Sequence, residues 1–412
     1  MPAATVTVTR RRDLVWFVFG LCLPLPWIMA EALKGLGIQV EVVAMLAGLA
    51  VLGAAFMLAW SCEIAERDIP QSLALLVLAL VGVLPEYAID LHFAWQAGID
   101  PAYAGYATAN MTGANRMLIG LGWTSVVLVA CWKTQSEELA IHPRQSLELR
   151  FLIWATLYSF IIPLGGEISL LDAAVLLLLF AAYVRAAMGG DTPEVDLEGP
   201  AALIDREFKD IGRRVWAVGL FFFAGYAIYV SAEPFAESLV TMGHRYDIDE
   251  FLLVQWIAPL ASESPEFIVA IIFALRLRGS IGIGALVSSK VNQWTLLVGA
   301  LPIAYAISSG SFSGLPLDGR QTEELLLTSA QSLFAAILLS TLSVTKRSAL
   351  LLTSLFLAQL FLTTPLIRNG FTVAYLLLSF GVLAFGPAER RQAFFALLRG
   401  RSPEVSGPPS AE

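Results

Sequence analysis

Long apolar runs follow one another along the whole chain and are separated by short polar segments. Runs of about 20 apolar residues are long enough to cross the hydrocarbon core of a bilayer as an α-helix. Twelve such runs predict an all-α polytopic membrane protein. We place the transmembrane helices at residues 14–33, 39–61, 70–95, 103–132, 149–164, 168–187, 214–242, 250–275, 280–308, 328–344, 348–366 and 371–387.

Basic residues orient these helices, because Lys and Arg are enriched in the cytoplasmic loops of membrane proteins. When the N-terminus is placed in the cytoplasm, most Lys and Arg residues fall on the cytoplasmic side. The opposite side then holds Lys34, Arg245, Arg320 and Arg368. The distribution predicts an integral membrane protein, in the plasma (inner) membrane, with both the N- and the C-terminus in the cytoplasm.

The composition agrees with this class of protein. The mean hydropathy is +0.71 and 15% of the residues are charged, whereas an average soluble chain has about 25% charged residues. These values exclude an ordinary soluble domain and make the lipid bilayer, not nucleic acid, the expected partner. The three cysteines lie far apart and show neither metal-ligand spacing nor a disulfide framework.

A hydrophilic segment near the middle of the chain is the longest between two predicted helices. We expect it to link two five-helix repeats, with one extra helix at each end of the chain. The predicted segments are a cytoplasmic N-terminus (1–13), an extra N-terminal helix (14–38), a first repeat (39–187), a cytoplasmic linker (188–213), a second repeat (214–366), an extra C-terminal helix (367–389) and a cytoplasmic tail (390–412).

Two Pro-Glu pairs lie inside very apolar segments, Pro85-Glu86 in the third predicted helix and Pro265-Glu266 in the eighth. A carboxylate at mid-membrane depth costs about 2.5–3.5 kcal/mol, and a proline that interrupts the helix frees backbone carbonyls. The predicted topology runs the first helix outward and the second inward. Two inverted copies of such an element indicate an ion path that works by alternating access.

Further oxygen-bearing side chains accompany both pairs. Asp90 lies one turn beyond Glu86, and Glu263 lies three residues before Glu266 on the same helix face. The helix that follows each pair carries neutral polar residues. Carboxylate, hydroxyl and carbonyl oxygens are hard ligands that suit Ca²⁺, Na⁺, Mg²⁺ or H⁺. The candidate cation-binding residues are Glu86, Asn110, Asn115, Ser262, Glu263, Glu266, Ser289 and Gln293.

These motifs resemble the cation/calcium exchanger superfamily, whose members carry two inverted repeats. Each family repeat reads approximately G-T-S-x-P-E on one helix and G-N-x-x-G-S-N-x-x-N/D on the next. Residues 261–266 and 284–290 follow this pattern, and the first copy matches at Pro85-Glu86 and at residues 110–115. The resemblance implies a secondary cation antiporter that moves Ca²⁺ or another cation against Na⁺ or H⁺. It implies no cofactor besides the transported cations.

The resemblance also assigns roles position by position. Glu86 and Glu266 fall on the central cation-ligating glutamates, which makes them the candidate metal ligands. Ser262 and Glu263 fall on the Thr and Ser of the first motif. In the second motif of the first repeat, Asn115 falls on the family's Asn. In the second repeat, Lys290 falls on the same motif position. Ser289 falls on the motif Ser, and Gln293 on the last polar position.

The chain departs from the family pattern where Gly82, Val83 and Ala114 lack the expected hydroxyl groups, and where Lys290 replaces a neutral residue. We hypothesise that Lys290 neutralises part of the Glu263 and Glu266 charge, so that fewer cations bind. Further charged residues that could modulate the site are Arg116 and Asp90. An alternative is that Glu86 and Glu266 form structural salt bridges with Arg116 and Lys290.

Other functions fit the sequence less well. An intramembrane enzyme would need a histidine pair or a similar motif, but His92, His142 and His244 have no histidine partner three or four residues away. We therefore expect a transporter and not an enzyme. A channel fits an inverted repeat with broken helices less well than a carrier does. A transport-altered or regulatory family member stays open, as do the ion pair, the stoichiometry and the oligomeric state.

Overall fold

A computed structural model describes residues 3–32, 37–65, 68, 83–188, 197, 199–361 and 364–403. Within this part the chain is almost entirely helical, and nine helical segments are long and apolar enough to cross a membrane. The predicted all-α polytopic class is therefore confirmed. The count of twelve stays a prediction, since residues 70–82 of the third predicted helix lie outside the described residues. The chain forms two compact units, Met1–Phe93 with Val184–Pro265 and Ala94–Tyr183 with Glu266–Glu412.

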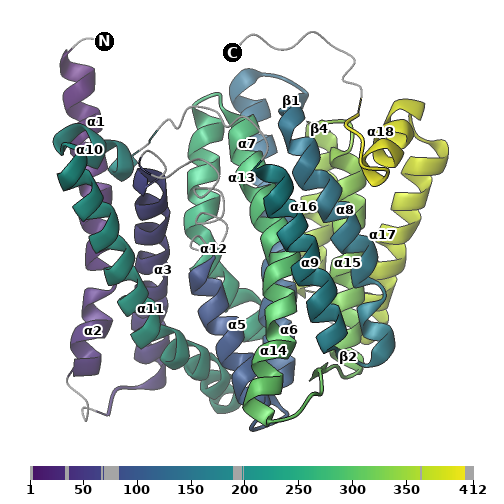
Figure 1. Ribbon diagram of the computed structural model, residues 1–412, viewed down its shortest axis with the longest axis horizontal. Helices are drawn as coiled ribbons and strands as arrows, with labels where there is room; N and C mark the ends of the chain where they lie inside the picture. Colours follow the sequence, from purple (N-terminus) through teal and green to yellow (C-terminus); the bar gives the residue numbers. More distant parts are fainter. Residues whose placement is uncertain are drawn as a thin grey trace. The chain divides into compact units, whose positions relative to one another are not determined.

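The first unit is built around two long helices that pack along each other, α3 and α11 (Figure 1). Small residues let them approach closely: a Cβ atom added to Gly48 of α3 would lie 2.8 Å from the Phe235 ring of α11. The Ser61 hydroxyl donates a hydrogen bond across this contact to the Ala217 carbonyl at 2.8 Å. The helices that lie wholly or mainly in this unit are α1 (Ala3–Cys22), α2 (Leu25–Ala32), α3 (Val40–Ala65), α5 (Leu84–Ala97), α10 (Gly199–Glu207), α11 (Asp210–Tyr246) and α12 (Glu250–Leu275).

The N-terminal helix differs from the prediction of one unbroken span over residues 14–33. The chain bends at Leu23-Pro24 and continues as α2, because proline cannot donate the next helical hydrogen bond. The first turns of α1 pack on α10, a helix inside the predicted linker. Arg10 pairs with Glu207 at 2.9 Å. A second ion pair joins Arg206 to Asp13 at 3.2 Å, so charged residues fasten these two helices together.

The second unit repeats one order of elements. A helix leads through a π-helical turn into a second helix, and a strand, a helix, a strand and a helix follow. The first copy is α6 (Tyr103–Met117), η1 (Leu118–Trp123), α7 (Thr124–Thr134), β1 (Glu138–Ala140), α8 (Ser146–Ser159), β2 (Glu167–Ile168) and α9 (Leu170–Ala187). The second copy is α13 (Gly279–Asn292), η4 (Gln293–Leu297), α14 (Val298–Ser309), β3 (Leu315–Pro316), α15 (Gly319–Leu339), β4 (Ser343–Thr345) and α16 (Lys346–Phe361).

Strand pairing shows that these two copies are inverted. Antiparallel pairs form between β1 and β4 and between β2 and β3. By their order in the copies, β1 corresponds to β3 and β2 corresponds to β4. Replacing each strand by its counterpart turns the β1–β4 pair into the β3–β2 pair, so the two pairs are equivalent. Helix α8 runs from the first pair to the second, whereas α15 runs from the second to the first. Equivalent elements therefore lie at opposite ends of the unit, as inverted repeats require.

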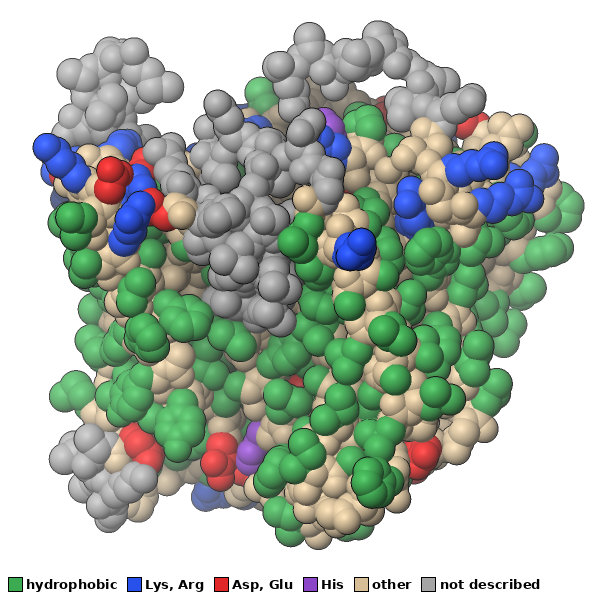
Figure 2. Space-filling model, in the orientation of Figure 1, with side chains coloured by type: hydrophobic (Ala, Val, Ile, Leu, Met, Phe, Trp, Pro, Cys, Tyr) green, Lys and Arg blue, Asp and Glu red, His purple; other side chains and the backbone are tan. Residues whose placement is uncertain are grey.

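Two further helices follow the second copy, α17 (Pro365–Phe385) and α18 (Ala388–Leu398). The apolar pattern predicts α17 but not α18, most of which lies in the predicted cytoplasmic tail. Lys and Arg side chains gather at the end of the unit that carries α18 (Figure 2). On α17 large apolar side chains are exposed, among them Leu366, Leu377 and Phe385. An exposed apolar surface of this kind suits contact with lipid.

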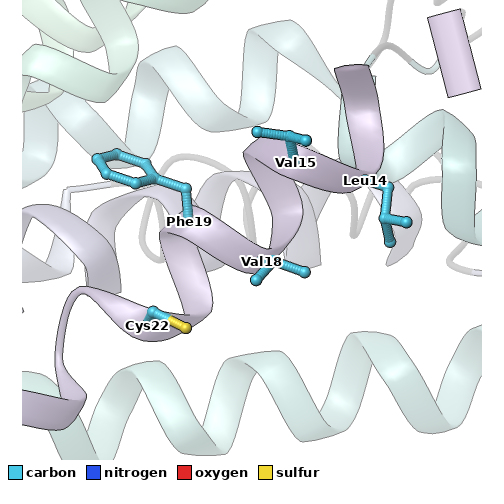
Figure 3. A pocket seen from close by; sticks show the side chains of 5 residues that line it. All are labelled: Leu14, Val15, Val18, Phe19 and Cys22. Carbon is cyan, nitrogen blue, oxygen red and sulfur yellow. The ribbon is translucent and has the colours of Figure 1, made fainter. Parts of the chain in front are cut away.

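A shallow groove on α1 has the same character. Its lining consists of Leu14, Val15, Val18, Phe19 and Cys22 (Figure 3). All five side chains are apolar or weakly polar, and none offers an oxygen ligand. The groove therefore suits an acyl chain of the bilayer and not a cation.

Candidate cation-transport site

The first Pro-Glu pair opens helix α5. The helix begins at Leu84, so Pro85 lies in the first turn, where its missing N–H would have no helical partner in any case. Glu86 and Asp90 are four residues apart on one face and are 1% and 0% exposed. Gly82, which the sequence reading aligned with a motif Thr, lies outside the described residues. The described part thus presents two buried carboxyl groups at the start of one helix.

The second Pro-Glu pair lies within α12, which runs unbroken from Glu250 to Leu275. The prediction that Pro265 interrupts this helix is wrong. Pro265 nevertheless has no N–H, so the Ala261 carbonyl lacks its usual helical donor. The Ser264 hydroxyl donates a hydrogen bond to the Leu260 carbonyl in the same turn. A continuous helix can therefore still offer the backbone oxygen that a cation site needs.

Carboxyl and hydroxyl groups surround that backbone position on α12. Glu263 is 2% exposed and Ser262 is 7% exposed, whereas Glu266 is half-buried. The Ser262 hydroxyl donates to the Ala258 carbonyl at 3.3 Å. A hydroxyl oxygen that donates its hydrogen keeps lone pairs for a cation. Ser262, Glu263 and Glu266 therefore present oxygen ligands along one turn.

In the second unit, Lys290 and Asn115 bind each other. The Lys290 ammonium donates to the Asn115 side-chain oxygen at 2.8 Å and to its backbone oxygen at 3.0 Å. The Asn115 amide nitrogen donates to the Met111 carbonyl at 2.8 Å, which keeps the side-chain oxygen facing the lysine. The ammonium also lies 4.5 Å from the centre of the Trp294 ring, within range of a cation–π interaction.

This pair joins equivalent positions of the two repeats. Asn115 lies three residues before the π-helical turn η1, and Lys290 lies three residues before η4. The motif alignment expected this correspondence. Both residues are fully buried. Turns of this type are frequent at functional sites, and here they mark the position where one repeat supplies an amide and the other an ammonium group.

The other predicted residues of this unit are also buried. Asn110 and Gln293 are 0% exposed. The Ser289 hydroxyl is buried and has no hydrogen-bond partner within the described structure. Among the described residues, no group of three or more His, Cys, Asp or Glu side chains is arranged to hold a metal ion. The predicted ligands combine few carboxylates with many neutral oxygens.

Arg116 has an acidic partner that the sequence reading missed. Its guanidinium lies 2.6 Å from the Glu324 carboxylate, and the two side chains are 2% and 3% exposed. Arg368 lies 3.7 Å from the same carboxylate. The sequence reading started this span at residue 328 and assigned Arg368 to an outer loop. The structure begins α15 at Gly319 with an Asp318–Gln321 capping box, a motif visible in the sequence.

Two inverted helical repeats, together with buried carboxyl groups on α5 and α12 and buried neutral polar side chains on α6 and α13, are typical of a secondary active cation antiporter. The chain belongs to the sodium/calcium exchanger protein family, whose family model matches residues 38–189 and 216–364. The resemblance stated from the motifs is therefore confirmed, and the protein is a transporter, not an enzyme.

Solved structures of exchangers share the fold. The crystal structure of the H⁺/Ca²⁺ exchanger CAX is 43% identical, with 95% of this chain and 98% of that chain covered and a TM-score of 0.89. The structure of YfkE is 14% identical over 87% and 99% of the two chains, with a TM-score of 0.63. The sodium-calcium exchanger NCX_Mj is 18% identical over 79% and 99%, with a TM-score of 0.53. A comparison with curated protein sequences gives no match.

Proposed function

We propose that this protein exchanges Ca²⁺ for H⁺ across the plasma (inner) membrane. The observation that carries the proposal is the 43% identity to the H⁺/Ca²⁺ exchanger CAX over 95% of this chain. The identity to the sodium-calcium exchanger NCX_Mj is 18% over 79% of the chain. The first value supports a shared substrate pair, whereas the second supports a shared fold.

The proposed ligands of the transported cation are Glu86 and Glu266, assisted by Glu263. Carboxylate oxygens suit Ca²⁺, and a carboxylate oxygen that holds a proton no longer holds the cation. Exchange follows because the same groups bind Ca²⁺ when the site faces one side and protons when it faces the other. We assign supporting neutral oxygens to Asn110, Ser262, Ser289 and Gln293, whereas the oxygens of Asn115 bind the Lys290 ammonium.

Lys290 supports a proton-coupled exchanger over a sodium-coupled one. Its ammonium already binds two oxygens of Asn115, at 2.8 and 3.0 Å. Those oxygens would otherwise be free to hold a monovalent cation at the equivalent motif position. A covalently attached positive charge takes that place, so this position needs no transported Na⁺.

The test is Ca²⁺ uptake into proteoliposomes that contain the purified protein, under an imposed pH gradient or an imposed Na⁺ gradient. We expect uptake with the pH gradient and at most background uptake with the Na⁺ gradient. Glu86→Gln and Glu266→Gln should each reduce uptake at least about tenfold, because each removes a charged ligand. The control is Glu138→Gln, which changes an exposed carboxylate in β1. Uptake driven by Na⁺ alone, or unchanged uptake in both variants, contradicts the proposal.

A further inference from the structure

A stripe of polar residues runs along α15, although this helix is one of the membrane-spanning candidates. The stripe members recur every three or four residues, which places them on one helix face. None is more than 6% exposed. They are Gln321, Glu324, Thr328, Gln331 and Ser332. Polar groups buried at membrane depth are costly and usually have a functional partner.

The charged member of this stripe, Glu324, lies between two arginines. Arg116 of α6 approaches it at 2.6 Å, and Arg368 of α17 approaches it at 3.7 Å. Arg368 also pairs with Glu323 at 2.8 Å, so two acidic and two basic side chains balance one another. A buried ion pair of this kind is weak evidence for stability but leaves a large charge imbalance when one member is removed.

The cluster adjoins the position where the two repeats meet. Arg116 directly follows Asn115, which accepts hydrogen bonds from the Lys290 ammonium. Gln331 of the α15 stripe donates to the Arg116 backbone oxygen at 3.3 Å. Gln359 of α16 accepts from the Arg116 guanidinium at 3.4 Å. Residues of two helices, α15 and α16, thus bind the Arg116 guanidinium, one residue along the chain from the Asn115–Lys290 pair.

We propose that Glu324 is a positioning residue that sets the affinity for the divalent cation by compensating the charge of Arg116. A guanidinium one residue from Asn115 repels an incoming Ca²⁺, and the carboxylate at 2.6 Å cancels much of that field. Arg368 holds the carboxylate from the other side. The extra C-terminal helix α17, outside the two repeats, therefore takes part in ion selection. The inference rests on the proposed cation transport.

The test compares the apparent KM for Ca²⁺ in proteoliposomes. Glu324→Gln should raise it about tenfold, because it removes one negative charge next to the guanidinium. Arg116→Gln should leave KM unchanged or lower it, and the double variant should return KM to within about threefold of the wild type. The control is Glu138→Gln, the same change on an exposed carboxylate in β1, outside this cluster; its KM should stay at the wild-type value.

The opposite directions for Glu324 and Arg116 distinguish charge compensation from a merely structural role, which would impair both variants alike. An unchanged KM in Glu324→Gln, or a raised KM in Arg116→Gln, overturns the inference. If Glu324→Gln does not fold, Arg116→Gln and the double variant still decide. Wild-type uptake under the pH gradient tests the proposed function separately. If the wild type takes up no Ca²⁺, titration of the same purified variants with Ca²⁺ decides the inference by the same ordering of affinities.

Discussion

Asn115 and Lys290 occupy equivalent positions of the two repeats but carry different charges. The neutral amide of one binds the ammonium group of the other at 2.8 Å. The Trp294 ring at 4.5 Å adds a cation–π interaction, which is worth about 0.5–2 kcal/mol. The lysine at position 290 of one repeat therefore places a positive charge against Asn115, the equivalent position of the other repeat.

Replacing Lys290 by alanine should change the electrical charge moved per Ca²⁺ by about one elementary charge, because the attached cation is removed and another cation can take its place. The measurement is the transport current on a supported membrane, combined with Ca²⁺ flux on the same preparation. Lys133→Ala, an exposed lysine near the end of α7, is the control. An unchanged current per Ca²⁺ and an unchanged pH profile would contradict this role for Lys290.

Asp68 lies outside the helices that could span the membrane, and it receives hydrogen bonds from two arginines of α11. Burial raises the pKa of Asp68, but the hydrogen bonds from Arg213 and Arg214 lower it more, so its pKa lies below the ordinary value of 3.8. A carboxyl group with a lowered pKa stabilises the fold above its unfolded pKa. That contribution is lost as the pH falls through the folded pKa.

Asp68→Asn should therefore lower the unfolding temperature at pH 7, and the difference from the wild type should shrink below about pH 4. Thermal unfolding in detergent between pH 3 and 8 measures it. Asp210→Asn serves as the control, because Asp210 approaches the same Arg213 but its side chain is 79% exposed. A difference that persists at the lowest pH would show that the ion pair does not stabilise this contact.

The lengths and order of the helices could largely be predicted from the apolar runs. Helix ends made of polar residues could not. The span predicted at 250–275 agrees with α12, because long apolar segments flank its polar centre on both sides. The span predicted from residue 328 begins at Gly319. Its first turns carry Glu323 and Glu324, which were taken for a loop. Their partner Arg368 lies 44 residues or more beyond them in the chain, and a one-dimensional pattern cannot show that pairing.

In the candidate site, too, some features could be predicted from the sequence and others could not. The motif alignment predicted that Asn115 and Lys290 are equivalent, and their equal distances from η1 and η4 agree. It could not show that they bind each other, because that depends on how the repeats pack. A break at Pro265 was expected from helix chemistry, but α12 continues through it. The proline removes one helical hydrogen bond, and the rest of the 26-residue helix remains.

Gly120 lets the π-helical turn η1 lie against α16. A Cβ atom at this position would lie 2.1 Å from the Phe356 ring, and Phe356 is fully buried. Gly120→Ala should therefore destabilise the protein by about 1–3 kcal/mol, even though alanine is the better helix former. Thermal unfolding in detergent measures the change.

Gly219→Ala in α11 is the matched control, since its added Cβ would meet nothing within 4 Å. It should be neutral or stabilise by up to about 1 kcal/mol. If Gly120→Ala unfolds at the same temperature as Gly219→Ala, the close approach of Phe356 is not a constraint on this turn.

In the second unit, each strand of one repeat pairs with a strand of the other repeat. The pair of β1 with β4 closes one end, and the pair of β2 with β3 closes the other. With the N-terminus in the cytoplasm, the positive-inside rule places the first pair on the cytoplasmic side and the second outside. The predicted even number of spans places the C-terminal segment on the same side as the first pair.

Single cysteines in a background without Cys22, Cys62 and Cys131 test this orientation. In intact cells a membrane-impermeant maleimide should label Ser313→Cys, which is exposed beside β3. It should label Glu138→Cys in β1 and Ser402→Cys only after the cells are permeabilised, because the predicted orientation places both on the cytoplasmic side. The reverse pattern would contradict the orientation but keep the inverted repeats. Labelling of Ser313→Cys and Glu138→Cys from the same side would contradict the inversion itself, because the two strand pairs would then not lie on opposite faces of the membrane.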